Sequence, residues 1–251
     1  MSGNRASLPR LHVTASLGEG AGVPLLPGQA HYLVTVLRKG TGDAFLAFNG
    51  RDGEWRCALE TADRKQAAAR ALAMTRPQTG LCDLHLLFAP LKKARIDYMA
   101  QKATEMGAAV LRPVLTRFTV AERVKTERLA ANAVEAAEQC NLLAVPEIRE
   151  PAKLMEALGA WPADRQLLFC DEALVGGAPP ADALRALPDE ARRAPWAVLI
   201  GPEGGFDEAE RARLHALPQA HAVSLGPRIL RADTAAVAAL ALWQSVLGDW
   251  R

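Results

Sequence analysis

The pattern of apolar residues changes near residue 80, and this change constrains what the chain can fold into. Before it, short apolar runs such as Ala44–Phe48 and Trp55–Leu59 are separated by Asn-Gly and Asp-Gly turn signals. After it, apolar runs of strand length alternate with stretches of helical periodicity. Closely spaced hairpins favour a small β-barrel or sandwich, whereas alternating strands and helices favour a mostly parallel sheet covered by helices.

We therefore predict a β-rich domain over residues 1–75 and an α/β domain over residues 76–251, with the linker at 76–80. A chain of 251 residues, half of them hydrophobic, has enough material for two cores. The strands expected in the second domain are 84–91, 110–115, 145–148, 166–171, 196–200 and 221–225. The helices expected there are 92–106, 123–140, one from 152, 181–187, 207–217 and 233–248. Asp207 followed by acidic residues predicts a capped helix start.

Two glycine-rich turns follow apolar runs late in the chain. The first turn, Gly201-Pro202-Glu203-Gly204-Gly205-Phe206, follows Ala197–Ile200, and the second begins at Gly226 after Ala222–Leu225. Glycine permits positive φ angles and the close approach of a ligand to the backbone. Loops at the carboxyl ends of parallel strands form the binding sites of open α/β sheets. We therefore expect the two turns to form two walls of one small-molecule pocket.

Several common classes of site have no signal in this sequence. The first strand of the α/β region leads into Lys92-Lys93 rather than a Gly-x-Gly-x-x-Gly loop, and there is no P-loop, which argues against a nicotinamide-dependent dehydrogenase. The four cysteines are widely spaced with no CxxC pair, so we expect reduced, mostly buried thiols and no metal site. With no membrane-length apolar run and no signal peptide, we expect a cytoplasmic location.

The two halves of the chain differ in charge. Residues 1–128 contain 19 basic and 11 acidic residues, a net charge of +8, whereas residues 129–251 contain 11 basic and 17 acidic residues, a net charge of −6. A basic half is the electrostatic footprint of a polyanionic partner. Charge alone favours a solvated basic surface over a specific polyanion site.

The two glycine turns also carry a resemblance. GPEGGF, followed by LGPRILRADTA at residues 225–235, resembles the C-terminal signature of the RsmE family, bacterial 16S rRNA (uracil-N3)-methyltransferases of the SPOUT class. Glu138–Cys140 and Val145–Glu147 are similar to the central motif of that family, and His31–Arg38 with Gly42-Asp43 to its N-terminal domain. The resemblance therefore spans most of the chain.

The resemblance implies a fold, a cofactor and partners. It implies an N-terminal PUA-like RNA-binding β-barrel and a C-terminal SPOUT α/β domain with a trefoil knot. The residues alone would favour an unknotted doubly wound sheet, because knots are nearly absent from folds. The resemblance further implies S-adenosyl-L-methionine as cofactor, ribosomal RNA or the assembled small ribosomal subunit as substrate, a homodimer, and neither a metal nor a membrane.

Carried onto this sequence, the resemblance assigns cofactor-binding and catalytic residues. The cofactor-binding residues are Leu199, Ile200, Gly201, Glu203, Gly204, Leu225, Gly226, Ile229, Leu230 and Thr234. Methylation at N3 of uracil requires loss of the imide proton, which a base or nearby cations would assist. We expect Arg231, and secondarily Arg228, to stabilise charge on the uracil or to bind its phosphate. Glu203 is expected to accept a proton, or else to cap the following helix or orient the cofactor, and Thr234 alternatively caps the last helix.

Further residues are expected to contact RNA, and two positions depart from the family pattern. The expected RNA contacts are Arg10, His31, Arg38, Lys39, Arg51, Lys92, Lys93, Glu138 and Gln139. Lys92 and Lys93 open a helix, where cations oppose the helix dipole, so a phosphate partner would explain them. Asn141-Leu142 replaces the Gly-Arg of the family, so Arg117 or Arg123 would have to substitute for that arginine. Asp233 stands where the family often has glutamate.

Two other functions remain open at this point. One is a different SPOUT methyltransferase, acting on the ribose 2′-oxygen of rRNA or tRNA. The other is a non-catalytic RNA-binding protein that keeps the same fold. Measuring cofactor binding distinguishes a methyltransferase from the non-catalytic RNA-binding protein. The intact glycine turns predict that the cofactor binds.

Overall fold

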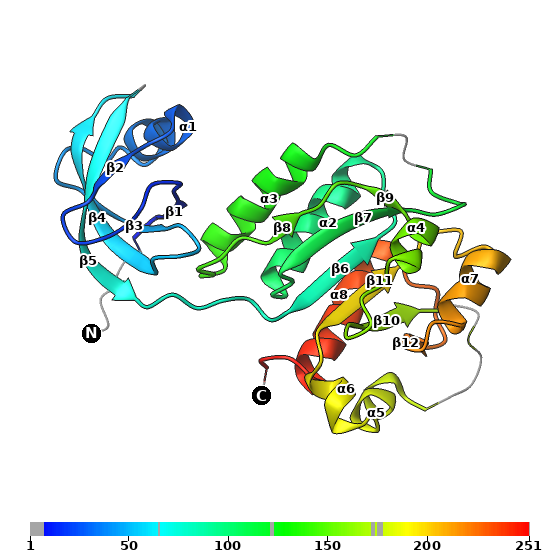
Figure 1. Ribbon diagram of the computed structural model, residues 1–251. Coiled ribbons are helices and arrows are strands. Elements are labelled where there is room, and N and C mark those ends of the chain that lie inside the picture. The colour runs from blue at the N-terminus through cyan, green and yellow to red at the C-terminus, as the bar shows by residue number, and fades with distance from the viewer. Residues whose placement is uncertain (1–7, 65, 121–122, 172–173, 175–177, 251) are drawn as a thin grey trace. The chain divides into compact units, whose positions relative to one another are not determined.

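The computed structural model describes residues 8–64, 66–120, 123–171, 174 and 178–250, and the chain divides into two compact units (Figure 1). The first unit consists of the chain up to Gly80 together with Ala137–Val145, and the second of Leu81–Ala136 and the chain from Pro146 onward. The predicted domain boundary instead assigns segment 137–145 to the second domain. The contacts of Arg10 described below explain why this segment packs with the first.

The first unit is built on a five-stranded sheet of order β1-β3-β4-β5-β2. Its strands are β1 (Arg10–His12), β2 (Gly22–Pro24), β3 (Ala44–Phe48), β4 (Glu54–Ala62) and β5 (Ala67–Arg76). β1 pairs with β3 in parallel, and the other pairs are antiparallel. The predicted hairpin between β3 and β4 is confirmed, with Gly50 and Gly53 at positive φ angles of 79° and 80°.

A helical stretch in the first unit was not predicted. Helix α1 (Pro27–Ala30) continues directly into the π-helix η1 (His31–Val36). The β-branched and aromatic residues of this segment favour a strand by propensity. Ala30 and Leu33 are fully buried in the core of the unit, so packing of one helical face outweighs that propensity.

The second unit is a seven-stranded sheet of order β12-β10-β11-β6-β7-β8, with β9 also paired to β7, and every pair is parallel. Its strands are β6 (Leu84–Phe88), β7 (Val110–Leu115), β8 (Glu147–Ile148), β9 (Ala152–Lys153), β10 (Gln166–Cys170), β11 (Trp196–Ile200) and β12 (Ala220–Val223). Its helices are α2 (Lys93–Glu105), α3 (Thr126–Gln139, whose last turn lies in the first unit), α4 (Leu154–Gly159), α5 (Pro180–Arg185), α6 (Asp189–Arg193), α7 (Glu208–His215) and α8 (Ala232–Val246). The predicted mostly parallel sheet is confirmed, and the short α6 is an addition to the predicted elements.

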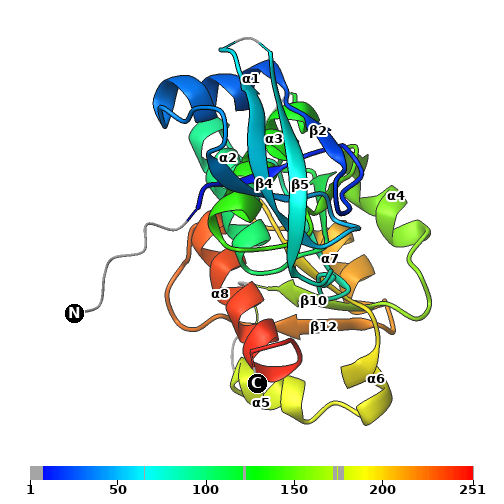
Figure 2. The ribbon, with the colours of Figure 1, turned by 90° about the vertical axis from the view of Figure 1, so that its left-hand side faces the viewer.

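Helices cover both faces of this sheet. Along β11, Trp196, Val198 and Ile200 pack into a core shared with α2 and α8, which lie next to each other (Figure 2). Ala197 and Leu199 point to the opposite face, where α4 and α7 pack. Because β11 is buried on both faces, its sequence is continuously apolar rather than alternating.

Arg10 connects the first unit to the end of helix α3. Its Nη1 donates hydrogen bonds to the carbonyl oxygens of Ala137 and Glu138, at 3.0 and 2.9 Å, and its Nη2 donates to the carbonyl of Leu142 at 2.8 Å. The last carbonyls of a helix have no partner within the helix, and a cation is favourable at that end. The side chain of Arg10 therefore satisfies the end of α3 and holds segment 137–145 to the sheet.

A buried ion pair fixes the position of that guanidinium. Arg10 Nε lies 2.7 Å from Glu54 Oε2, and the two side chains are only 7% and 4% exposed. In addition, the backbone N–H of His12 donates to Glu138 Oε1 at 2.8 Å. Arg10 and Glu138, which we expected to contact RNA, are engaged within the protein instead. The sequence could not reveal this, because Glu54 is 44 residues from Arg10 along the chain and the carbonyls at the end of α3 are more than 120 residues away.

We predict that Arg10→Ala lowers the free energy of unfolding by about 3–5 kcal/mol, because it leaves Glu54 as a buried charge without its main partner. The matched control is Arg70→Ala, which removes a solvent-exposed pair with Glu60 and should cost less than about 1 kcal/mol. Urea denaturation followed by circular dichroism measures both. Equal losses in the two variants would contradict the structural role assigned to Arg10.

Candidate functional site

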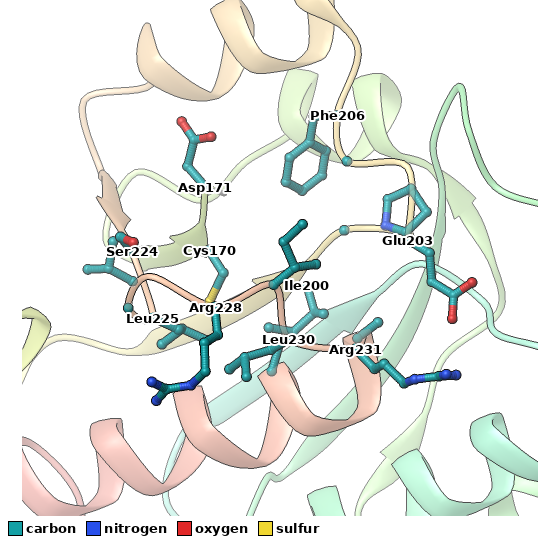
Figure 3. A pocket seen from close by; sticks show the side chains of 18 of the residues that line it. Cys170, Asp171, Ile200, Glu203, Phe206, Ser224, Leu225, Arg228, Leu230 and Arg231 are labelled. Atoms are coloured by element: carbon teal, nitrogen blue, oxygen red, sulfur yellow. The ribbon is translucent and has the colours of Figure 1, made fainter. Parts of the chain in front are cut away.

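A cavity of about 430 Å³ lies at the carboxyl ends of three adjacent parallel strands, β12, β10 and β11 (Figure 3). Its walls are residues 170–171 at the end of β10, residues 200–203 and 205–206 at the end of β11, and residues 223–232 at the end of β12, together with Arg211 of α7 and Ala235 of α8. Both predicted glycine turns contribute, each from the end of its own strand. The structure therefore brings the two turns together around one pocket, as the sequence predicts.

The pocket combines an apolar interior with charged groups. Ile200, Leu225 and Leu230 lie close together in its interior, next to the start of α8 (Figure 3). Arg228 and Arg231 also line the pocket and are exposed to solvent. The site can thus enclose a flat apolar group while presenting cations to a second, anionic partner.

One arginine of α2 connects the two glycine turns. Arg95 Nη1 lies 3.8 Å from Glu203 Oε1 in the first turn and 3.6 Å from Asp233 Oδ2 just after the second turn. Glu203 is largely exposed, so this contact orients its carboxylate more than it stabilises the fold. Asp233, where the family often has glutamate, retains the acidic partner of Arg95.

The glycines of the two turns are required for different reasons. A Cβ atom added to Gly201 would lie 3.0 and 3.1 Å from Cζ and Cε2 of the Phe206 ring, so this ring packs directly on the glycine. Gly226 has open space around it but adopts a φ of +105°, which L side chains rarely adopt. Gly201 therefore lets an aromatic wall approach, whereas Gly226 provides a backbone conformation.

A third wall, which our sequence analysis missed, follows β10. The carboxylate of Asp171 is 3% exposed, and its Oδ2 is 2.9 Å from both Arg211 Nε and His215 Nε2 of α7. The neighbouring Cys170 is half-buried, and desolvation of its thiol raises the pKa to about 12, which keeps the thiol protonated at neutral pH. The sequence predicts strand 166–171, and binding sites form at the carboxyl ends of parallel strands, so this wall could have been found from the end of that strand. The segment after the strand has no glycine turn, so its sequence carries no other signal of a site.

Helix α7 begins with the capping arrangement that the sequence predicts. Asp207 Oδ1 accepts a hydrogen bond from the backbone N–H of Glu210 at 2.7 Å, and Glu210 Oε2 accepts one from the N–H of Asp207 at 3.1 Å. Glu203 therefore does not cap this helix. Of the roles expected for Glu203, proton uptake and orientation of the cofactor remain. Thr234 does not cap α8 either, because the N-cap position of that helix is Arg231.

The predicted cofactor residues divide between the pocket and its surroundings. Those that line the cavity are Ile200, Gly201, Glu203, Leu225, Gly226, Ile229 and Leu230, together with the proposed catalytic residues Arg228 and Arg231. Leu199 points to the opposite face of the sheet, and Gly204 faces Phe118 rather than the cavity. Thr234 is exposed and is not part of the lining.

The expected RNA contacts outside the pocket lie in both units. His31, Arg38 and Arg51 are exposed on the first unit, with Lys39 half-buried, and Gln139 is exposed at the end of α3. Lys92 is exposed just before α2 in the second unit, whereas the side chain of Lys93 lies outside the described part of the chain. Within the described residues there is neither a group of acidic, His or Cys side chains that could hold a metal nor a helix able to cross a membrane.

Comparison with known proteins agrees with this geometry. Residues 78–244 match the RNA methyltransferase domain family, and residues 27–72 match the RNA methyltransferase PUA domain. The chain is 32% identical to ribosomal RNA small subunit methyltransferase E of Synechocystis, over 90% of this chain and 74% of that protein. It is 27% identical to the protein of the same name from Rickettsia conorii, over 92% of this chain and 93% of that protein.

A solved structure extends this similarity to the fold. Ribosomal RNA small subunit methyltransferase E from Neisseria gonorrhoeae, determined with bound S-adenosyl methionine, superposes with a TM-score of 0.81. The two proteins share 26% sequence identity, and the alignment covers 97% of this chain and 100% of that one. With a PUA domain, a methyltransferase domain and a pocket at the ends of three parallel strands, the chain belongs to the RNA methyltransferase family.

Proposed function

We propose that the protein transfers a methyl group from S-adenosyl-L-methionine to N3 of a uracil in 16S ribosomal RNA. The observation that carries this proposal is the pocket between the two glycine turns, in a chain similar along its whole length to a small-subunit rRNA methyltransferase crystallised with S-adenosyl methionine. The N3 position comes from the resemblance to the RsmE family. The small-subunit substrate is that of the named relatives.

The residues of the pocket fit this cofactor. A volume of about 430 Å³ falls in the ordinary range of small-molecule sites. Ile200, Leu225 and Leu230 provide an apolar enclosure for the adenine, and the backbone of the turns at Gly201 and Gly226 provides polar groups for its edge. When bound, the cofactor supplies an electrophilic methyl group on a positively charged sulfur.

The residues of the pocket must then accept the N3 proton of the uracil and stabilise the negative charge that remains on its ring. Neutral N3 carries a proton and has no free lone pair, so attack requires that this proton leave and that negative charge on the ring be stabilised. We assign charge stabilisation to Arg231, with Arg228 as a second cation. We assign proton uptake to Glu203, whose carboxylate is largely exposed and only 3.8 Å from Arg95, because the other carboxylate of the pocket, Asp171, is buried and held at 2.9 Å by both Arg211 and His215.

The remaining features of the proposal concern the architecture and the partners. A closed PUA-like barrel in the first unit would hold RNA through exposed cations such as Arg38 and Arg51, with the chemistry in the second unit. A trefoil knot in the second unit is supported by the likeness to the RsmE family. We further propose a cytoplasmic homodimer that acts on rRNA or on the assembled small subunit.

We predict that Gly201→Ala weakens binding of S-adenosyl-L-methionine about tenfold, and Gly201→Val more, because the added atoms displace the Phe206 ring from the pocket wall. Gly159→Ala, at the end of α4 with no atom within 4 Å of the new Cβ, is the matched control and should bind normally. Isothermal titration calorimetry measures the affinities. Wild-type affinity in both Gly201 variants would argue against this placement of the cofactor.

We predict that Arg231→Ala lowers the turnover number by about 10²- to 10³-fold, with a much smaller effect on affinity for RNA, because its charge is needed at the reacting base. Arg193→Ala, a largely exposed arginine on α6, serves as the control for general loss of charge. Single-turnover methylation assays and RNA binding separate the two effects. A loss confined to RNA affinity would make Arg231 a binding residue instead.

The proposed function itself is tested by comparing 16S rRNA from cells with and without the gene. We expect one uridine to lose a methyl group in the deletion strain, and the purified protein to restore it as 3-methyluridine, identified by nucleoside chromatography and mass spectrometry. Loss of a 2′-O-methylated nucleoside would favour the ribose methyltransferase. No change in any nucleoside, with RNA binding intact, would favour the non-catalytic RNA-binding protein.

A further inference from the structure

The loop after β7, residues 116–120, lies at the same edge of the sheet as the pocket. β7 runs parallel to β6, and β6 runs parallel to β11, so the carboxyl ends of these strands point the same way. The loop carries Phe118 and Val120, whose surfaces are 47% and 73% exposed. An exposed apolar surface at this edge of the sheet is a candidate contact for a ligand or partner.

This loop is held in place by hydrogen bonds. The backbone N–H of Arg117 donates to Glu210 Oε1 at 2.8 Å, and the N–H of Thr116 donates to Thr119 Oγ1 at 2.9 Å. Glu210 is only 5% exposed, and its other oxygen accepts the N–H of Asp207 at the start of α7. One buried carboxylate thus ties the loop to the segment that directly follows the first glycine turn.

Phe118 packs on that glycine turn from outside the pocket. A Cβ atom added to Gly204 would lie 3.4 Å from Cβ and 3.7 Å from Cγ of Phe118. Gly201 and Phe206 of the same turn line the pocket. The glycine turn therefore has the proposed methylation site on one side and the exposed ring of Phe118 on the other.

The exposed arginines of this loop and of the pocket favour an anionic partner. Arg117 is exposed beside the aromatic ring, and Arg228 and Arg231 are exposed on the pocket. The carboxylate of Glu203 is the opposing charge in the first glycine turn, and Arg95 lies 3.8 Å from it. An aromatic ring beside arginines is the combination by which proteins hold unpaired nucleotides, stacking the base and contacting the phosphate.

We propose that Arg117 and Phe118 form a binding site for single-stranded RNA beside the methylation pocket. Phe118 stacks on an unpaired base next to the target uracil, and Arg117 contacts a backbone phosphate. This inference rests on the proposed function, since it needs an RNA whose uracil enters the pocket. A uracil withdrawn from its stack leaves neighbouring bases without a stacking partner, and the ring of Phe118 replaces that partner.

The test measures RNA affinity by fluorescence anisotropy, using a short labelled oligouridylate and a duplex of the same length as probes. We expect Phe118→Ala and Phe118→Leu to weaken binding of the single strand about tenfold, and Phe118→Trp to retain it, because stacking requires a ring rather than apolar volume. Arg117→Gln should flatten the salt dependence by about one phosphate contact, a log–log slope change of about 0.7. Tyr98→Ala, an aromatic of 43% exposure on α2, is the matched control and should bind as the wild type.

Affinity for S-adenosyl-L-methionine, measured by calorimetry, should be unchanged in all these variants. Wild-type RNA affinity in both Phe118→Ala and Phe118→Leu would overturn the proposal. So would a loss that follows a change of oligomeric state in light scattering, because the surface would then be a contact between two copies of the chain. If these variants lose RNA affinity but the rRNA comparison shows no missing methyl group, the proposed function fails while the RNA site stands.

Discussion

Burial of the central strand β11 on both faces is the constraint on which the rest of the second unit depends. All five of its residues are buried, and its neighbours β10 and β6 run parallel to it. Parallel neighbours require crossover connections. Here α5, between β10 and β11, packs on one face of the sheet, and α7, between β11 and β12, packs on the other. The loops that leave the sheet then have to emerge at one edge, so the three walls of the pocket meet there as a consequence of sheet topology.

Buried carboxylates organise the polar parts of both units. Glu54 holds the guanidinium of Arg10, Glu210 joins the β7 loop to the start of α7, and Asp171 holds Arg211 and His215 at the third wall of the pocket. Each carboxylate is at most 5% exposed. A buried carboxylate is costly unless its hydrogen bonds are satisfied, and each of these accepts bonds from segments distant in sequence. Such groups therefore fix loops in position, and removal of a single partner lowers the free energy of unfolding by leaving a buried charge unpaired.

The sequence predicts most strands and helices of the second unit, the β3–β4 hairpin of the first and two walls of the pocket, because these depend on local patterns. Apolar runs of strand length mark β6, β7 and β11, and glycine turns mark the loops after β11 and β12. The helix at residues 27–36, the Asp171 wall and the burial of Arg10 depend on contacts between segments far apart in the chain. The sequence suggests Arg10 as an RNA contact, but its guanidinium is paired with Glu54 and hydrogen-bonded to the carbonyls at the end of α3.

The departure from the family pattern at residues 141–142 has a conformational explanation. Asn141 adopts a φ of +60°, a left-handed conformation that favours glycine and that asparagine tolerates better than most residues. Asparagine at this position therefore fits the left-handed turn that ends α3 in this chain. The following Leu142, which replaces an arginine, packs against the small cluster of Phe48, Ala137 and Leu143. The substitution exchanges a cation for packing within the first unit, and the RNA contact proposed for Arg117 supplies a cation in its place.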